Sequence, residues 1–262
     1  MDIVLSIKNL YFSYEDKSIL SNINIDIEKG KFISIIGPNG SGKTTLLKNM
    51  SSVLIPDRGK VFFQGKDIRE YSRKQLSRYM AYVPQSSYIN FEFTAGDIVL
   101  MGRSPFLKPF ESEQAEDIKI AEDAMRMTNV FEIKDKRITE ISGGERQRVM
   151  IACALAQTPQ IILLDEPVAN LDIQHQVEIL SVLKKLSKIN KVTVITVLHD
   201  LNLSAEYSDL VVLLKEGKII EYGPPKDIIT EENIKNAYNA NVYMTKNPMT
   251  GNPHVIPITK NI

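Results

Sequence analysis

The first fifty residues have the apolar pattern of two strands that lead into a loop and a helix. Ile23, Ile25 and Ile27 alternate with polar residues, which predicts a strand with one buried face. Residues 32–36 are mostly apolar and β-branched, as in a strand that is buried on both faces. A glycine-rich loop follows, and residues 44–52 have the pattern of a helix. We therefore predict a buried strand, a loop and a helix in that order.

The middle of the chain has a different character. Short strands are expected at residues 61–63 and 79–83, but from about residue 94 to residue 158 the strand signals vanish. Helices are predicted at residues 95–101, 113–127 and 144–157. We interpret this region as a helical insertion into an α/β core.

Alternation of strands and helices resumes after residue 160. Buried strands are predicted at residues 161–164 and 192–197, with a helix at 173–186 between them. The pattern then predicts, in order, a hairpin at 211–222, a helix at 231–238 and two short strands around 249–253. The fold class that follows is α/β.

Composition narrows the class of protein. The 262 residues are 43% hydrophobic and 24% charged, which is typical of a soluble globular protein. Lys plus Arg and Asp plus Glu both number 32, and this balance argues against a nucleic-acid partner. No signal peptide is expected, and no segment reaches the roughly 18 to 20 apolar residues that span a bilayer. Any membrane role must then act through a partner.

Residues 37–44 match the phosphate-loop motif G-x-x-x-x-G-K-[ST] in full. Glycines let such a loop point successive backbone N–H groups at phosphate oxygens, and the following helix adds its positive dipole end. Lys43 is expected to reach the outer phosphates of ATP, and the Thr44 hydroxyl to bind Mg²⁺. The predicted nucleotide contacts are Gly37, Pro38, Asn39, Gly40, Ser41, Gly42, Lys43, Thr44 and Thr45.

Two carboxylates follow the buried strand at 161–164. Ligands of open α/β sheets bind at the carboxyl ends of strands, so Asp165 is expected to hold Mg²⁺. Glu166, one residue further, is expected to act as the general base that takes a proton from the attacking water. Alone, this pair is more typical of a solvated turn; the phosphate loop makes the catalytic interpretation the stronger one.

Residues 141–147, Ile-Ser-Gly-Gly-Glu-Arg-Gln, resemble the L-S-G-G-Q signature of the ABC ATPases. The same residues also form a helix capping box, because Ser142 is followed three residues later by Glu145. Both interpretations are compatible, since a capped helix start is an anion site. The chain departs from the signature at Ile141 and at Glu145, and Glu145 brings a negative charge near the expected nucleotide.

Four further positions match the family in order. Gln85 resembles the Q-loop glutamine, a metal ligand that also links to the permease, and Asp172 lies in a segment like the D-loop. His199 resembles the switch histidine that contacts the γ-phosphate. Tyr14 resembles the aromatic residue that stacks on adenine, although Tyr11 is a neighbouring candidate. The resemblance spans residues 5 to about 225.

The resemblance implies an ABC ATPase fold, that is, a RecA-like mixed sheet with an antiparallel β subdomain and a helical insertion. The ATPase domain is expected at residues 1–230, with its core at 1–90 and 159–230 and its helical subdomain at about 91–158. Residues 231–262 are expected to form a C-terminal helix and a short β tail. Members of the family work as head-to-tail dimers, so Ser142 and Gly144 are expected to serve the nucleotide of a second copy. Gly143, Glu145 and Asp172 are also expected to contact nucleotide.

The implied partners are two membrane permease subunits and, indirectly, an extracytoplasmic substrate-binding protein. The chain is then expected at the cytoplasmic face of the cell membrane. Residues 101–105, 199–202 and 247–257 further resemble importers of ferric siderophores, haem and cobalamin. A molybdate or tungstate importer and a non-transport ATPase of iron–sulfur assembly are the alternatives. A kinase or GTPase is disfavoured, because it would share the phosphate loop alone.

Overall fold

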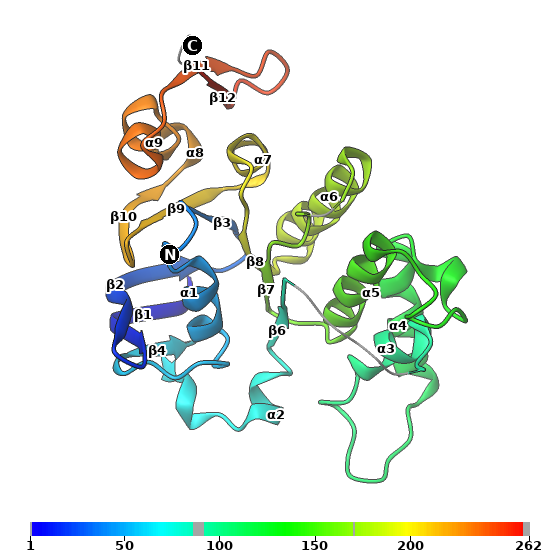
Figure 1. Ribbon diagram of the computed structural model, residues 1–262. Helices are drawn as coiled ribbons and strands as arrows, with labels where there is room; N and C mark the ends of the chain where they lie inside the picture. The colour runs from blue at the N-terminus through cyan, green and yellow to red at the C-terminus, as the bar shows by residue number, and fades with distance from the viewer. Residues whose placement is uncertain (1, 86–91, 170, 259–262) are drawn as a thin grey trace. The chain divides into compact units, whose positions relative to one another are not determined.

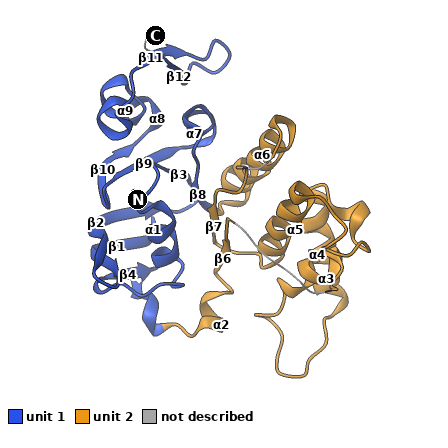
Figure 2. Cartoon of the chain, in the orientation of Figure 1, with its two compact units in different colours: residues 1–70, 193–262 blue, residues 71–192 orange. Residues whose placement is uncertain are grey.

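The structure is a computed structural model that describes residues 2–85, 92–169 and 171–258. The chain divides into two compact units, one made of residues 1–70 and 193–262 and the other of residues 71–192 (Figure 2). The division at about residues 91 and 158 that the sequence suggests stays a prediction.

The first unit begins with an antiparallel sheet of strand order β2-β1-β4-β5. Its strands are β1 (Ile3–Tyr14), β2 (Lys17–Glu28), β4 (Arg58–Phe63) and β5 (Lys66–Asp67). Ile23, Ile25 and Ile27 are buried, whereas Asn22, Asn24 and Asp26 are exposed, so the predicted alternation is confirmed. This sheet is the antiparallel β subdomain expected from the sequence.

The first unit also contains a mixed set of strands in the order β10-β9-β3-β8. Strand β3 (Phe32–Ile36) runs parallel to β8 (Thr193–Val197) and to β9 (Leu210–Lys215), and β10 (Lys218–Gly223) is antiparallel to β9. Every residue of β3 and of β8 is buried, which explains their mostly apolar and β-branched sequences. Helix α1 (Lys43–Met50) follows β3 through the glycine-rich loop.

The C-terminal part of the first unit packs on these strands (Figure 1). It comprises α7 (Leu201–Tyr207), α8 (Pro225–Ile228), α9 (Glu231–Tyr238), β11 (Val242–Lys246) and β12 (Pro253–Pro257). Strands β11 and β12 form an antiparallel hairpin. Val242 and Val255 of the hairpin share one apolar cluster with Ala205 of α7 and Ile36 of β3, so the hairpin is part of the core.

The second unit holds two parallel strands and most of the helices. Strand β6 (Met80–Val83) pairs with β7 (Ile161–Asp165), and all residues of β7 are buried. The helices are α2 (Arg73–Leu76), α3 (Ala95–Met101), α4 (Ala115–Met127), α5 (Gly143–Ala156) and α6 (Ile173–Asn190). A Cβ on Gly102 would lie 2.3 Å from the carbonyl oxygen of Cys153, so this glycine lets the end of α3 approach α5.

Most predicted elements are confirmed within two or three residues of their ends. The helix expected from Glu113 begins two residues later, because Gln114 precedes the first turn and its N–H donates to the Asp117 carboxylate at 3.0 Å. Helix α7 was not predicted. Among the described residues, no helix has both the length and the apolar character needed to cross a membrane.

Candidate functional site

The phosphate loop leaves the carboxyl end of β3 and closes at the start of α1. Gly37 has φ 149°, and a Cβ there would lie 2.1 Å from the carbonyl oxygen of Leu214, so only glycine fits. Gly42 precedes the helix with φ 100° and has no side chain with which to cap the first turn. The start of α1 is therefore suited to an anion.

Lys43 is folded into this loop. Its amino group is buried and donates to the carbonyl oxygens of Gly37 at 2.8 Å and of Pro38 at 3.0 Å. The hydroxyl of Ser41 is buried and has no hydrogen-bond partner among the described residues. Because an unsatisfied buried hydroxyl is costly, the loop fits a group that supplies acceptor oxygens, such as a nucleotide phosphate.

His199 follows the strand next to β3. Ile35 of β3 is in register with Val197 of β8, and the N–H of Leu198 donates to the carbonyl oxygen of Ile35 at 3.3 Å. The phosphate loop and His199 therefore leave the same edge of the sheet on neighbouring strands. His199 is exposed there.

Tyr14 is the last residue of β1, and its side chain is 45% exposed. Its ring contacts that of Phe12 edge to face, with centroids 4.9 Å apart. Tyr11, the rival candidate, is 37% exposed, so exposure does not separate the two tyrosines. Tyr14 is thus available for stacking but is not singled out by the structure.

The second unit brings Gln85 together with the acidic pair. Val83 of β6 is in register with Leu164 of β7, so Gln85 and Asp165 come from neighbouring strand ends. The Gln85 amide donates to Glu166 Oε2 at 2.6 Å. Glu166 has φ 52°, a left-handed conformation that is uncommon for a residue with a side chain and often found at functional sites. Asp165 is 2% exposed.

Ser142 caps the signature helix α5, and the predicted capping box is confirmed. The N–H of Glu145 donates to Ser142 Oγ at 3.2 Å, and the N–H of Ser142 donates to Glu145 Oε2 at 2.8 Å. This backbone bond lowers the pKa of Glu145, so its carboxylate is charged and occupied within the helix start. Ser142 and Gly143 are exposed, whereas Gly144 is partly buried.

Asp172 caps the next helix, α6. Its Oδ1 accepts the N–H of His175 at 3.0 Å and lies 2.8 Å from His175 Nδ1. The backbone bond from His175 lowers the pKa of Asp172. No motif in the sequence singles out His175. Asn170, the first residue of the predicted D-loop, lies outside the described residues.

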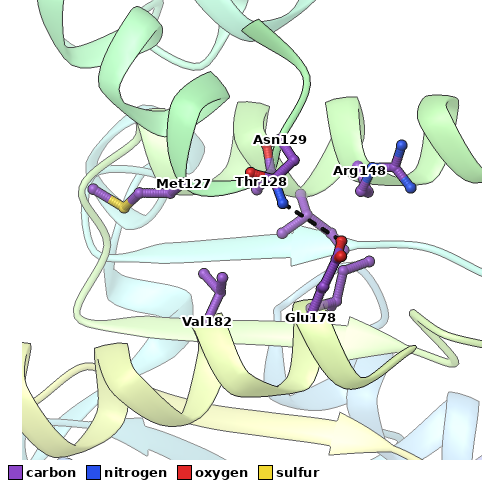
Figure 3. A pocket seen from close by; sticks show the side chains of 8 residues that line it. Met127, Thr128, Asn129, Arg148, Glu178 and Val182 are labelled. Atoms are coloured by element: carbon purple, nitrogen blue, oxygen red, sulfur yellow. Dashed lines mark hydrogen bonds between the residues drawn. The ribbon is translucent and has the colours of Figure 1, made fainter. Parts of the chain in front are cut away.

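A small cavity lies between the end of α4 and the helices α5 and α6 (Figure 3). Its volume of about 10 Å³ has room for roughly one water molecule, so it cannot hold a nucleotide. Asn129 donates to Glu178 across it at 3.4 Å. Nε and Nη1 of the buried Arg148 have no hydrogen-bond partner in the part of the chain that the structure describes. The cavity is therefore a gap in the packing between α5 and α6, the helices that Ser142 and Asp172 cap.

The stretch at residues 101–105 has a structural role. Arg103 is 7% exposed, and its Nε lies 2.9 Å from Asp117 Oδ1. Its Nη1 donates to the carbonyl oxygen of Ala156 at 2.8 Å, and its guanidinium lies 4.1 Å from the centroid of the Phe106 ring. Arg103 therefore ties the end of α3 to α4 and α5.

Comparison with known proteins gives consistent findings. The family model described as ABC transporter matches residues 20–169. An uncharacterised ABC transporter ATP-binding protein of Methanocaldococcus jannaschii is 39% identical over 97% of this chain and 98% of its own length. A hemin import ATP-binding protein of Thermobifida fusca is 36% identical over 98% of this chain and 89% of its own. A ferric enterobactin transport ATP-binding protein of Escherichia coli is 36% identical over 96% and 93%.

Solved structures of ABC transporters also resemble this chain. A transporter described as of metal-chelate type, in an inward-facing conformation, superposes with a TM-score of 0.86 at 29% identity and covers 99% of both chains. A dimeric ATP-binding cassette in a post-hydrolysis state, bound to ADP and Pi, gives a TM-score of 0.76 at 28% identity over 84% of this chain and 98% of that chain. Similarity to the first of these extends through the C-terminal hairpin.

Proposed function

The chain belongs to the ABC transporter family of ATPases, and from this premise we propose that it hydrolyses ATP to drive import of a ferric siderophore, haem or cobalamin. The contact of 2.6 Å between Gln85 and Glu166 at the end of β7 carries the ATPase part of the proposal. A glutamate held beside a glutamine at a strand end would be suited to bind a water molecule and a cation, which supports the catalytic interpretation. The cargo is proposed from the relatives named for import of hemin and transport of ferric enterobactin.

The phosphate loop would hold the phosphates of ATP. Lys43 would leave the carbonyl oxygens of Gly37 and Pro38 and donate to the outer phosphates, while the Ser41 hydroxyl gains an acceptor. Backbone N–H groups from Asn39 to Thr45 would supply further donors. Tyr14 would stack its exposed ring on the adenine.

Mg²⁺ fits the oxygen donors of this chain. No group of three or more His, Cys, Asp or Glu side chains forms a metal cage within the described residues. Mg²⁺ that is bound together with phosphates needs only one or two protein carboxylates, so that finding is compatible with it. Thr44, Gln85 and Asp165 would be its ligands, directly or through water, and the ion would neutralise charge on the phosphates.

Glu166 would take the proton from the water that attacks the γ-phosphate. The Gln85 amide donates to Glu166 Oε2 at 2.6 Å and would hold the carboxylate in place for this step. His199 would donate to the γ-phosphate from the end of β8, next to the strand that carries the phosphate loop.

A second copy of the chain would complete each site. Ser142, Gly143, Gly144, Glu145 and Asp172 would meet the nucleotide held by the phosphate loop of the partner. The exposed start of α5 supports this role, because N–H groups at a helix start attract phosphate oxygens. Glu145 is charged there, but its carboxylate accepts a hydrogen bond from the Ser142 N–H of its own helix start.

Two permease subunits would receive the motion of this dimer, and an extracytoplasmic binding protein would deliver the cargo to them. The chain would then act at the cytoplasmic face of the membrane. ATP drives such a cycle by stabilising the closed dimer, and its hydrolysis returns the dimer to the open state.

The isolated chain is expected to bind none of the cargoes. Its motifs are directed at ATP, Mg²⁺ or protein partners, and the cavity beside Arg148 has room for about one water molecule. Titration with a ferric siderophore, haem, cobalamin and molybdate should give no saturable micromolar binding, while basal ATP hydrolysis is measured in the same sample.

Deletion of the gene should abolish uptake of one of these cargoes and leave uptake of the others unchanged. Saturable binding of one cargo per isolated chain would show that this chain selects the substrate itself. Loss of molybdate uptake would replace the proposed cargo with an oxyanion, and co-purification with a soluble scaffold instead of a permease would remove the transport role.

A further inference from the structure

Two stretches that are far apart in the sequence, residues 199–202 and 247–257, are joined by hydrogen bonds. The Asn202 amide donates to the carbonyl oxygen of Val255 at 3.2 Å, and the N–H of Val255 donates to Asn202 Oδ1 at 2.7 Å. Asn202 thus pairs with the backbone of β12 as a neighbouring strand would. The hairpin is fastened to α7 by this pair.

Glu206, one turn further along α7, holds the loop of the hairpin. Its Oε1 accepts from Asn247 Nδ2 at 2.7 Å and from Thr250 Oγ1 at 2.8 Å, and its Oε2 accepts from Asn252 Nδ2 at 3.0 Å. Hydrogen bonds to an ionised carboxylate are about twice as strong as neutral ones. We call these six residues the hairpin latch: Asn202, Glu206, Asn247, Thr250, Asn252 and Val255.

The latch and the apolar core act on the same helix. Residues 202 and 206 share one face of α7, because they are four positions apart. Ala205 lies in the cluster that includes Val255 of the hairpin and Ile36, the last residue of β3. Helix α7 has only seven residues, and a helix of that length is not stable by itself. Its position is therefore set by what it contacts.

Helix α7 begins directly after His199. Asp200 caps the helix, and its Oδ1 accepts the N–H groups of Asn202 at 2.7 Å and Leu203 at 3.0 Å. The Ser204 hydroxyl donates to the carbonyl oxygen of Asp200 at 2.9 Å. A shift of α7 would thus move the backbone of Asp200, and with it the residue that precedes it.

We propose that the C-terminal hairpin positions His199 for ATP hydrolysis, and that Asn202 and Glu206 are the positioning residues through which it acts. The latch holds α7, α7 holds its cap at Asp200, and the cap fixes His199 at the end of β8. This inference rests on the role proposed above for His199. It gives the stretches at 199–202 and 247–257 a task in the ATPase cycle.

The test compares Glu206→Ala and Asn202→Ala with a matched control, Met249→Ala, in the full-length chain. Met249 lies in the same loop and its side chain is 89% exposed, so its loss leaves the latch intact. Both latch variants should lower kcat about tenfold with KM for ATP changed less than about twofold, as expected when only the transition state loses a contact. Glu206→Gln, which keeps one acceptor oxygen, should have an intermediate kcat.

Two further measurements separate positioning from a general structural role. Hydrogen–deuterium exchange should become faster in the peptide of residues 199–207 and stay unchanged in α9. In a His199→Ala background, Glu206→Ala should lower the residual kcat no further. Cooperative thermal unfolding of each variant confirms that it is folded.

Three results would overturn the inference: a wild-type kcat in both latch variants, unchanged exchange at residues 199–207, or the same loss of kcat with and without His199. A wild-type kcat in His199→Ala itself would instead remove the role of His199, and that failure belongs to the proposed function.

Discussion

Replacement of Glu166 by glutamine is expected to lower ATP turnover by about 10²-fold or more, the range found for loss of a general base. Glutamine keeps the size of the side chain and still has an oxygen that accepts the Gln85 amide, which lies 2.6 Å from Glu166 Oε2. It cannot take a proton from water. The left-handed backbone at this position, φ 52°, is no harder for glutamine than for glutamate.

The measurement is steady-state phosphate release, together with sedimentation in the presence of ATP and Mg²⁺. The variant should bind ATP and accumulate as a dimer, because the step that reopens the dimer is lost. Glu113→Gln, at an exposed glutamate of the second unit, is the matched control and should behave as wild type. Turnover within about twofold of wild type in Glu166→Gln would remove the general-base assignment.

Replacement of Lys43 by alanine is expected to weaken ATP binding by about 10- to 100-fold and to stop turnover. This estimate takes about 1.5–3 kcal/mol for hydrogen bonds from a charged donor, at 1.4 kcal/mol per factor of ten. In the structure the Lys43 amino group lies 2.8 Å from the Gly37 carbonyl oxygen, within the loop that would receive the phosphates. Removing it takes away a positive charge at the place where negative charge must bind.

Isothermal titration with ATP and Mg²⁺ measures this loss. Lys48→Ala changes the same residue type in the last turn of the same helix and should bind ATP as wild type does. Unchanged ATP affinity in a folded Lys43→Ala variant would contradict the assignment of the phosphate loop.

Features that depend on neighbours in the sequence were predicted well. The phosphate loop, the capping box of Ser142 and Glu145, and helix α9 at Glu231–Tyr238 are all encoded within a few residues. Strands β3 and β7 were predicted from their mostly apolar sequences, and in the structure all their residues are buried. Each of these elements can be recognised from its own residues alone.

Features made by distant residues could not be predicted. Arg103 at the end of α3 pairs with Asp117 of α4, and Gln85 after β6 bonds to Glu166 after β7. No pattern in the sequence identifies either partner. Helix α7 is too short for its periodicity to stand out, and its contacts with the hairpin come from residues more than 40 positions away. Residues 199–202 and 247–257 were singled out by their resemblance to importers, but only the structure shows that they bind each other.

The central claim is that two copies of this chain build each ATP site, with the phosphate loop from one and the signature from the other. The most direct test is the number of ATP molecules bound by a mixed dimer of Lys43→Ala and Ser142→Arg chains, isolated through a different affinity tag on each chain. Shared sites place both defects in one site and leave the other intact, so the mixed dimer should bind one ATP. If each chain supplied its whole site, both sites would be defective, and a mixed dimer that binds no ATP would contradict the account.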